Sequence, residues 1–511
     1  MIPISPLYDS ASIRVNIEFR PLSTDHRSPT VFSMNNLDEL RRRFGDRLMT
    51  SDASMVAFQS DGVTALSARP CAVVIALNED DVVFTVSWCF KNDVPWVARG
   101  SGTSLSGGSV PIADGIVIAM NRMNRMIRID EVNRIAIVEP GLITGRLIRA
   151  ANAVGLHYAP DPSSLQVCSI GGNLAFNSGG AHCLKYGMTS NHILGARVVL
   201  ADGEIVELGS ESLEGEGPDF MGLFCGSEGT MGVATQITVR LIPPPETYFC
   251  VMAGYATVED AGNAVATIIA AGLLPGAMEI MDAIAMKAAH EAVGANYPSG
   301  CEAVLIVELD GSIESVNADK PRLEELFKQS GAVSIEVAKD AETRYAIWTG
   351  RKSVFSAVGR ISPDFIVQDG VVPRGKLGFA LRRITEISKR TGIVIANVFH
   401  AGDGNLHPLI MYDGRIDGAL HRAEIVAAEI VRLCIELGGS ITGEHGVGLE
   451  KREFLGEMYD EPSMEMLGRL RVAMDPKTLA NRGKMFPTGE GEPFGLYGLH
   501  PLEKAGVISR E

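Results

Sequence analysis

The sequence predicts an α+β protein with at least two domains, and three observations lead to this prediction. The chain has 511 residues, which is long for one hydrophobic core. In its first part, β-like runs alternate with helical ones around a glycine-rich loop, in the βαβ pattern of parallel strands. From Tyr248 onward, strands and helices alternate in a pattern that we interpret as helices packed on an antiparallel sheet.

Composition and charge exclude several classes of function. The apolar fraction is 46% and the charged fraction 21%, as in ordinary soluble globular proteins. A net charge of −16 argues against nucleic acid as a partner. No apolar run reaches about 18 residues, so no membrane-spanning segment is expected. The first residues lack a basic region followed by an apolar core, so we expect a cytoplasmic protein without a secretory signal.

The elements that precede the loop follow from local patterns. Residues 37 to 48, rich in Leu and Arg, favour a surface helix, and residues 72 to 77 form a short apolar strand. Asn78, followed by three acidic residues, supplies an N-cap and an acidic first turn for a helix that continues to Phe90.

The glycine-rich loop spans residues 95 to 111, PWVARGSGTSLSGGSVP. Glycine lets a ligand approach the main chain closely, and successive N–H groups of such a turn form an anion-binding concavity. We therefore expect a phosphate or pyrophosphate ligand, with a plain loop or linker as the alternative. The Walker lysine is absent, and a strand rather than a helix follows, so neither the P-loop nor the Rossmann pattern applies.

Beyond the loop, the predicted elements alternate. Residues 134 to 139 form a strand, residues 144 to 153 a helix, and the proline-containing residues 160 to 164 a rigid loop. Residues 169 to 180 hold two glycine turns around a buried helical turn. Residues 198 to 208 form a hairpin around Ala-Asp-Gly.

Three prolines, residues 243 to 245, end the first part of the chain. In the second part, the predicted strands lie near 249–254, 276–282, 303–309 and 393–399. The predicted helices lie near 257–271, 283–292, 319–329, 374–390 and 417–438. Residues 484 to 511 are expected to be a loose extension.

Several ordered motifs resemble one family of flavoproteins. ARGSGTSLSGG, CSIGGNLAFNSGG and GSEGTMGVAT are similar to the FAD-binding domain of the vanillyl-alcohol oxidase/p-cresol methylhydroxylase superfamily. FHAGDGNLHP and ITGEHGVG narrow the resemblance to the FAD-linked oxidase family, which contains glycolate oxidase catalytic subunits, D-lactate dehydrogenases and D-2-hydroxyglutarate dehydrogenases. The phrase VGRISPD, residues 358 to 364, is most similar to the glycolate oxidase type.

The resemblance implies a p-cresol methylhydroxylase-type FAD-binding domain of two α/β subdomains, followed by an α+β substrate (cap) domain with an antiparallel sheet. The expected boundaries are an N-terminal helical segment at 1–66, the FAD-binding domain at 67–245, the cap domain at 246–487 and a tail at 488–511. In some members of the superfamily, FAD is attached to a His in or near the glycine-rich loop. No His lies between Arg27 and Leu156 here, so FAD is expected to be non-covalent. The expected FAD contacts are Arg99, Gly100, Ser101, Gly102, Thr103, Ser104, Gly107, Gly108, Pro160, Asp161, Ser164, Gly171, Asn173, Ser178, Gly179, Gly232, Val233 and Asn481.

A second set of residues has side chains that could bind a metal ion. His400 and His407 frame a Gly-Asp-Gly turn that can bring the two imidazoles together, and imidazole suits several transition metals. Two histidines alone are commonly structural, but Glu444 supplies a third candidate ligand, and such a set with an open position suits catalysis. The resemblance implies that these three residues bind a divalent metal, for which zinc, manganese and iron are the candidates.

The resemblance also suggests the residues that act on the substrate. His445 is expected to be the general base, which takes the hydroxyl proton as hydride leaves for flavin N5. A structural role in a turn is its alternative. Arg351 is expected to bind the substrate carboxylate. In the stretch Ile366-Val367-Gln368-Asp369, an apolar residue stands where the hydroxyglutarate enzymes have a lysine before an aspartate, which favours a smaller acid such as glycolate or lactate.

The predicted activity is FAD-dependent oxidation of a small 2-hydroxy acid to the 2-oxo acid. The eight cysteines lack CxxC spacing, so this chain is not expected to hold an iron–sulfur cluster. The resemblance implies a second FAD-domain subunit and an iron–sulfur subunit as partners, which could hold the protein at the inner membrane. The alternatives are a stand-alone D-lactate or D-2-hydroxyglutarate dehydrogenase, or a catalytically silent FAD-binding subunit.

Overall fold

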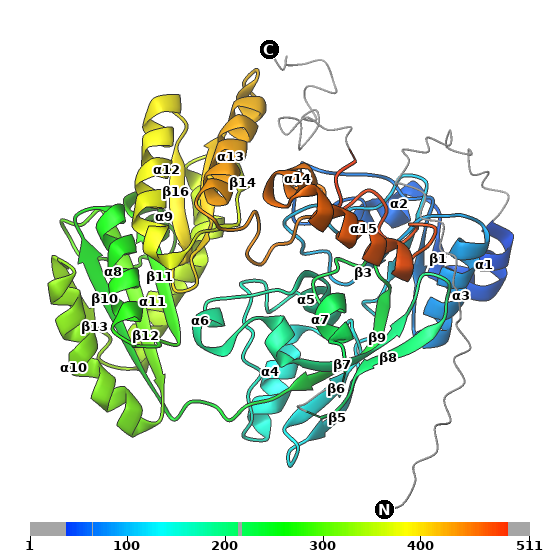
Figure 1. The fold of residues 1–511 in the computed structure, drawn as a ribbon, viewed down its shortest axis with the longest axis horizontal. Helices are drawn as coiled ribbons and strands as arrows, with labels where there is room; N and C mark the ends of the chain where they lie inside the picture. The colour runs from blue at the N-terminus through cyan, green and yellow to red at the C-terminus, as the bar shows by residue number, and fades with distance from the viewer. Residues whose placement is uncertain (1–36, 64, 213–216, 489–511) are drawn as a thin grey trace, which may run out of the picture.

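The computed structural model describes residues 37–63, 65–212 and 217–488. Most of the predicted N-terminal segment and of the C-terminal tail lies outside these described residues. Figure 1 shows two halves: the loop half, which contains the first two sheets, and the large-sheet half, which contains a seven-stranded sheet. The predicted surface helix is shorter than expected, because α1 (Asp38–Phe44) ends at Gly45, whose φ is 53°. The short helices α2 (Asp52–Met55), η2 (Gly45–Arg47) and η3 (Val56–Phe58) follow it.

The first sheet has the order β1-β2-β4-β3. Both β2 and β3 pair with β4 in parallel, which confirms the parallel prediction for this part of the chain. The Asn78 side chain accepts the N–H of Asp81 at the start of α3 (Glu79–Lys91), so the predicted N-cap is confirmed. The first residues of the glycine-rich loop form β3, and its glycines follow the carboxyl end of this strand. The strands are β1 (Leu48–Met49), β2 (Ala72–Ile75), β3 (Trp96–Arg99) and β4 (Ile116–Ala119).

The second sheet has the order β5-β6-β9-β7-β8, and all its neighbours are antiparallel. The prediction of parallel strands is wrong here, because short turns join β5 to β6 and β7 to β8, whereas parallel strands need a crossover of a dozen or more residues. The predicted hairpin is β7–β8 and is confirmed. The strands are β5 (Met126–Asp130), β6 (Ile135–Val138), β7 (Ile193–Val199), β8 (Ile205–Gly209) and β9 (Val233–Arg240). The helices are α4 (Thr144–Ala153), α5 (Ile170–Phe176), α6 (Cys183–Tyr186), η4 (Thr189–His192) and α7 (Phe220–Phe224).

The third sheet has the order β13-β10-β12-β11-β16-β18-β14, and its paired strands run antiparallel, as predicted. One hydrophobic core lies between this sheet and α8, α10, α12 and α13, and another lies between it and α9 and α11. The strands are β10 (Thr247–Tyr255), β11 (Ala277–Asp282), β12 (Ala303–Gly311), β13 (Ser334–Val337), β14 (Asp364–Val367), β16 (Ile395–His400) and β18 (Pro408–Tyr412). The helices are α8 (Val258–Ala270), α9 (Ala283–Val293), α10 (Ile313–Gln329), α11 (Ala341–Ala357), η5 (Val358–Arg360), η6 (Arg374–Lys376), α12 (Leu377–Thr391) and α13 (Ala419–Glu436).

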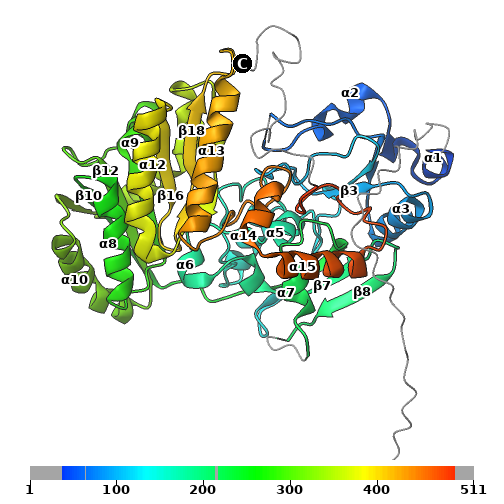
Figure 2. The same cartoon turned by 45° about the horizontal axis from the view of Figure 1, so that its top comes forward.

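A small ribbon and the end of the chain complete the fold. The ribbon pairs β15 (Gly370–Val371) with β17 (Asn405–Leu406). After it come η7 (Arg452–Phe454), α14 (Leu455–Met458) and α15 (Glu461–Met474), and α15 lies against the loop half in both views (Figures 1 and 2). Lys484 is not in a loose extension: it is buried and donates hydrogen bonds to the carbonyl oxygens of Gly108, at 2.9 Å, and Val110.

Candidate functional site

A cavity of about 460 Å³ lies where the glycine motifs meet the large-sheet half. The loop half contributes residues of the glycine-rich loop, the region around α5 and the start of β9. The large-sheet half contributes three residues of α11 and, farther along the chain, His407, Glu444 and His445. The three glycine motifs of the sequence therefore line one cavity together with the predicted chemical groups.

The glycine motifs line this cavity with main chain that no larger residue could provide. A Cβ atom at Gly108 would lie 2.4 Å from the Phe176 ring, and one at Gly100 would lie 2.2 Å from Ser169 Oγ. Gly102 has a φ of 72°, which favours glycine. Bare backbone N–H groups beside hydroxyl side chains suit a diphosphate, so the residues present fit the phosphate end of FAD.

Fourteen of the eighteen predicted FAD contacts line the cavity. The other four have different neighbours. Gly107 packs against Leu66 and Leu449, and Asp161 accepts a hydrogen bond from His182 Nδ1 at 2.9 Å. Pro160 lies next to Asp161 in the chain, outside the lining, and Gly179 adjoins Glu444. The lining residues are Arg99, Gly100, Ser101, Gly102, Thr103, Ser104, Gly108, Ser164, Gly171, Asn173, Ser178, Gly232, Val233 and Asn481.

Several lining residues were not predicted. Phe176 ends α5, and Gly172 and Ser169 begin it, with the Ser169 side chain accepting the N–H of Gly172. Glu228 also reaches the cavity, and its buried carboxylate accepts the N–H groups of Val447 and Gly448 at 2.6 and 2.8 Å. All of these residues lie within the glycine motifs of the sequence. No local pattern reveals the long-range hydrogen bonds of Glu228.

The predicted metal ligands meet as expected from the turn between the two histidines. His400 ends β16, His407 precedes β18, and Glu444 lies in the loop after α13. Their ligand atoms all lie within 4.8 Å of one another. Glu444 Oε1 lies 3.3 Å from His400 Nε2 and 3.4 Å from His407 Nε2. The buried Nδ1 of His407 has no hydrogen-bond partner. Two imidazoles and a carboxylate facing one point are a donor set that fits a divalent transition metal.

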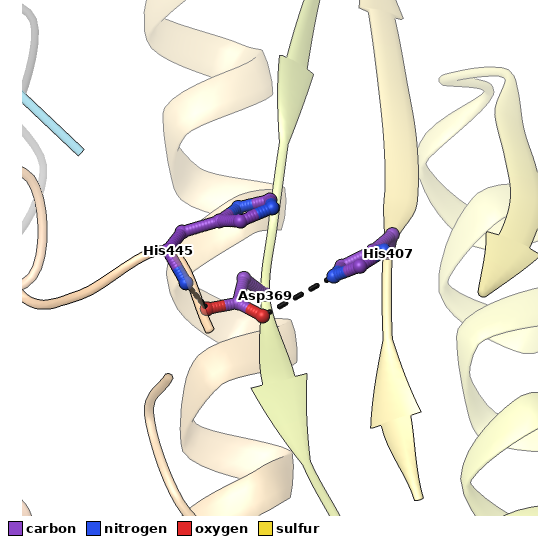
Figure 3. Close-up of side chains that lie close together, drawn as sticks. All are labelled: Asp369, His407 and His445. Carbon is purple, nitrogen blue, oxygen red and sulfur yellow. Dashed lines mark hydrogen bonds and ion pairs between the residues drawn. The ribbon is translucent and has the colours of Figure 1, made fainter. Parts of the chain in front are cut away.

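Asp369, His407 and His445 form a second cluster, shown in Figure 3. The buried Asp369 carboxylate accepts hydrogen bonds from the main-chain N–H groups of residues 443, 444 and 445, from Thr442 Oγ1 at 2.6 Å and from His407 Nε2 at 3.2 Å. Asp369 therefore holds the loop that carries Glu444 and His445. The rings of His407 and His445 stack with their centroids 4.8 Å apart.

Burial and ion pairing set the charges of the cluster. Burial would raise the pKa of Glu444, but His400 and the neighbouring histidines lower it to about 2. Burial lowers the pKa of His445 to about 4 although Asp369 opposes this shift. The imidazole of His445 is therefore neutral near pH 7. Its Nδ1 is buried without a hydrogen-bond partner, and its Nε2 lies 3.9 Å from Glu444 Oε1.

Arg351 does not line the cavity. It is buried in α11, where its Nε donates to Glu279 Oε2 at 2.7 Å and its Nη2 lies 2.6 Å from the same oxygen. Glu279 Oε1 in turn lies 2.6 Å from His400 Nδ1. The next residue, Lys352, does line the cavity and is exposed. The role of Arg351 as a carboxylate ligand stays a prediction.

Among the described residues, no helix combines the length and apolar character needed to cross a membrane. Two family models match the chain: the FAD binding domain over residues 70–209, and the C-terminal domain of FAD linked oxidases over residues 244–485.

Several relatives match over most of their length. The chain is 41% identical to glycolate oxidase subunit GlcD of Escherichia coli K12, over 87% of this chain and 89% of that protein. It is 38% identical to the protein of the same name from Bacillus subtilis, over 85% and 93%. It is 30% identical to a D-lactate dehydrogenase of Anaerostipes hadrus, over 82% and 90%.

Solved structures show the same fold at low identity. p-Cresol methylhydroxylase superimposes with a TM-score of 0.74 at 16% identity, covering 89% of this chain and 97% of that one. 4-Ethylphenol oxidase from Gulosibacter chungangensis gives a TM-score of 0.73 at 19% identity, over 88% and 96%. The predicted p-cresol methylhydroxylase-type fold is therefore confirmed. The chain belongs to the FAD-linked oxidase family and is an FAD-dependent oxidoreductase.

Proposed function

We propose that this protein oxidises a small 2-hydroxy acid, glycolate or D-lactate, to the corresponding 2-oxo acid. The observation that supports this proposal is the convergence of His400, His407 and Glu444 beside the neutral His445, at a cavity lined by the FAD-type glycine motifs. The names of the relatives, glycolate oxidase subunit and D-lactate dehydrogenase, point to the same substrate class.

Bound FAD supplies a hydride acceptor, and a divalent metal supplies a Lewis acid for the substrate hydroxyl. His400, His407 and Glu444 would hold the metal. The imidazole of His445, neutral and with an unpaired buried Nδ1, would take the proton of the α-hydroxyl as the hydride leaves Cα. Asp369 would keep this imidazole in place through the main-chain N–H of His445, at 2.9 Å.

The substrate carboxylate needs a cation or other donor at the cavity. Lys352 and Arg99 are the lysine and arginine of the cavity lining, and Arg99 is already bound to the carbonyl oxygens of Ser60 and Ser109 at 2.7 and 3.0 Å. Lys352 is thus available on α11, one residue after the predicted ligand Arg351.

The residues of this site favour a substrate with one carboxylate. The apolar residues Ile366 and Val367 end β14, and the following Gln368 donates to Glu450 Oε1 at 2.7 Å. None of these three residues offers a cation for a second carboxylate, as a hydroxyglutarate enzyme would require. D-2-Hydroxyglutarate dehydrogenase therefore stays a weaker alternative.

We further propose that the electrons leave through partner chains. The Escherichia coli and Bacillus subtilis relatives are named as a subunit of glycolate oxidase. By analogy, we propose a second FAD-domain subunit and an iron–sulfur subunit as partners, with the assembly in the cytoplasm or held at the inner membrane by those partners.

The test is anaerobic bleaching of the flavin band in purified protein. Glycolate, D-lactate, L-lactate and D-2-hydroxyglutarate are added separately, and the flavin absorbance is followed in a stopped-flow instrument. We expect rapid bleaching by glycolate or D-lactate. Bleaching by D-2-hydroxyglutarate alone would overturn the assignment of a small substrate.

A silent FAD-binding subunit is the remaining alternative, and the same experiment addresses it. If FAD is bound but none of the four acids bleaches it, the experiment is repeated in the presence of the partner subunits. Absence of bleaching in both cases would show that this chain has no hydroxy-acid oxidation of its own.

A further inference from the structure

Glu228 occupies a backbone position that suits glycine better than glutamate. It stands in the third glycine motif, in the run Gly-Ser-Glu-Gly-Thr-Met-Gly, and its φ is 54°, in the left-handed region. A residue with a Cβ atom costs roughly 1–2 kcal/mol in this region. The residue is also buried, with 3% of its surface exposed, and a buried carboxylate is costly unless it is hydrogen-bonded. A glutamate at this position therefore indicates that its carboxylate has a specific partner.

The partner is the loop that carries Glu444 and His445. Glu228 Oε1 accepts the N–H of Val447 at 2.6 Å, and Oε2 accepts the N–H of Gly448 at 2.8 Å. Both carboxylate oxygens thus bind successive main-chain N–H groups, as an anion does in a turn of the backbone. Burial raises the pKa of Glu228 to about 6 although these two N–H groups oppose the shift, so the carboxylate is ionised near pH 7.

Ser106 of the glycine-rich loop holds the same segment of chain. Its Oγ donates to the carbonyl oxygen of His445 at 3.0 Å, and its own carbonyl oxygen accepts the N–H groups of Leu449 and Glu450 at 2.9 and 3.2 Å. A Cβ atom at Gly448 would collide with that carbonyl oxygen, so glycine permits the close approach. Two residues of the loop half, from different glycine motifs, therefore grip the loop that carries His445.

The large-sheet half grips the other end of this loop. Asp369 accepts the N–H groups of residues 443, 444 and 445. The N–H of Gly446 binds Thr442 Oγ1 at 2.9 Å, and this hydroxyl in turn donates to Asp369. Every main-chain N–H from residue 443 to residue 448 is thus bound, the first three by a carboxylate of one half and the last two by a carboxylate of the other.

We propose that Glu228 and Ser106 are positioning residues for the reaction, which hold the loop of residues 443–448 against the glycine motifs. The inference rests on the proposed function, in which His445 takes the hydroxyl proton as the hydride leaves. Asp369 fixes the loop within the large-sheet half, whereas Glu228 and Ser106 fix where the loop lies relative to the FAD-type motifs. The two contacts therefore set the register between the base and the cofactor wall.

The test compares Glu228→Gln and Ser106→Ala with the wild type, all loaded with FAD. Glu228→Gln keeps the shape of the side chain but turns an amide NH2 toward a main-chain N–H, so one hydrogen bond is lost. Ser106→Ala removes the hydroxyl that donates to His445. Glu139→Gln is the matched control, because Glu139 is also a buried carboxylate of the loop half that accepts a main-chain N–H, at 2.8 Å, but it holds Arg125 and not the loop.

Two measurements are made on each variant. Hydrogen–deuterium exchange, read by mass spectrometry in peptides that contain residues 443–451, reports how firmly the loop is held. Turnover with the acid that bleaches the wild-type flavin gives kcat and KM. FAD content and Tm establish that each variant is folded.

We expect faster exchange of the loop amides in both variants, with the larger change in Glu228→Gln. Its kcat should fall by about 10- to 100-fold, because a displacement of about 1 Å can cost a factor of this size. Ser106→Ala should lose a smaller factor. KM and FAD content should keep their wild-type values, because Asp369 still holds Glu444. Glu139→Gln should match the wild type in loop exchange and kcat even if its Tm falls.

Three results would overturn the inference. Wild-type exchange of the loop in Glu228→Gln would show that the carboxylate does not hold it. Faster exchange with wild-type kcat would show that the grip does not serve the reaction. Loss of FAD with wild-type exchange would make Glu228 a cofactor ligand instead. If Glu228→Gln does not fold, Ser106→Ala decides, and wild-type exchange and kcat in that variant would contradict the proposal.

Failure of the proposed function gives a different result. If no hydroxy acid bleaches the wild-type flavin, the substrate class is wrong, and the comparison of kcat no longer applies. The exchange measurement remains. Faster exchange in Glu228→Gln beside wild-type exchange in Glu139→Gln would still support the grip on the loop, and equal exchange in the two variants would overturn it.

Discussion

The two walls of the cavity are built in different ways. The wall from the loop half is largely main chain, in which Gly100 and Gly108 leave no room for a side chain. The wall from the large-sheet half presents His407, Glu444 and His445, whose loop is held by the buried carboxylate of Asp369. A second buried carboxylate, Glu279, contacts His400 beside them. This difference suggests that the first wall sets cofactor affinity and the second sets the chemistry, so that substitutions should separate the two.

The largest effect is expected at His445. Replacement of the proposed base, His445→Ala, should lower kcat by about 10²- to 10⁴-fold, the usual contribution of a general base. FAD content should not change, because the side chain belongs to the second wall. Turnover and the ratio of flavin to protein absorbance measure the two effects. The control is His421→Ala on α13, outside the cavity, which should keep full activity. Loss of FAD in His445→Ala would contradict the division between the walls.

A smaller effect, on the cofactor alone, is expected at Gly108. The Cβ atom of Gly108→Ala would lie 2.4 Å from the Phe176 ring. Overpacking of this kind costs about 1–3 kcal/mol, which here would be lost from FAD binding. Titration of the apoprotein with FAD, followed by flavin fluorescence, gives the dissociation constant. Gly375→Ala, where a Cβ atom meets nothing within 4 Å, is the control. Equal FAD affinity in both variants would show that the ring of Phe176 moves freely.

The smallest effect is expected at the N-cap of α5. Ser169→Ala removes the bond from the Ser169 side chain to the N–H of Gly172 and should cost about 1 kcal/mol of stability. The matched variant Asp340→Ala removes the N-cap of α11 in the other half and should cost a similar amount. Thermal unfolding measures both. Only Ser169→Ala should also weaken FAD binding, because α5 lines the cofactor part of the cavity, and equal FAD affinities would remove this distinction.

Local signals in the sequence predicted much of the fold. The N-cap of α3 at Asn78, the β7–β8 hairpin and the alternation of the large-sheet half follow from short patterns that the structure confirms. The direction of the strands in the second sheet does not follow from such patterns, because it depends on which strands pair and not on their composition. The pattern of residues 134 to 153 reads alike in parallel and antiparallel surroundings.

The candidate site, like the fold, could be predicted from the sequence only in part. The glycine motifs are continuous in sequence, so they indicated most of one wall. The partners of the second wall are far apart in the chain: His400 and Glu279 are 121 residues apart, and Glu279 and Arg351 are 72 apart. One available signal was a glutamate inside an apolar strand, at Glu279 and again at Glu308. It indicates a buried ion pair but not the partner.

The buried position of Lys484 has a consequence for biosynthesis. Its ammonium group binds the carbonyl oxygen of Gly108, 376 residues earlier in the chain. At translation rates of about 5–20 residues per second, about 20–75 s pass between the synthesis of Gly108 and the synthesis of Lys484. The nascent chain therefore cannot give the glycine-rich loop this support until Lys484 has left the ribosome, so the flavin site is completed late in synthesis.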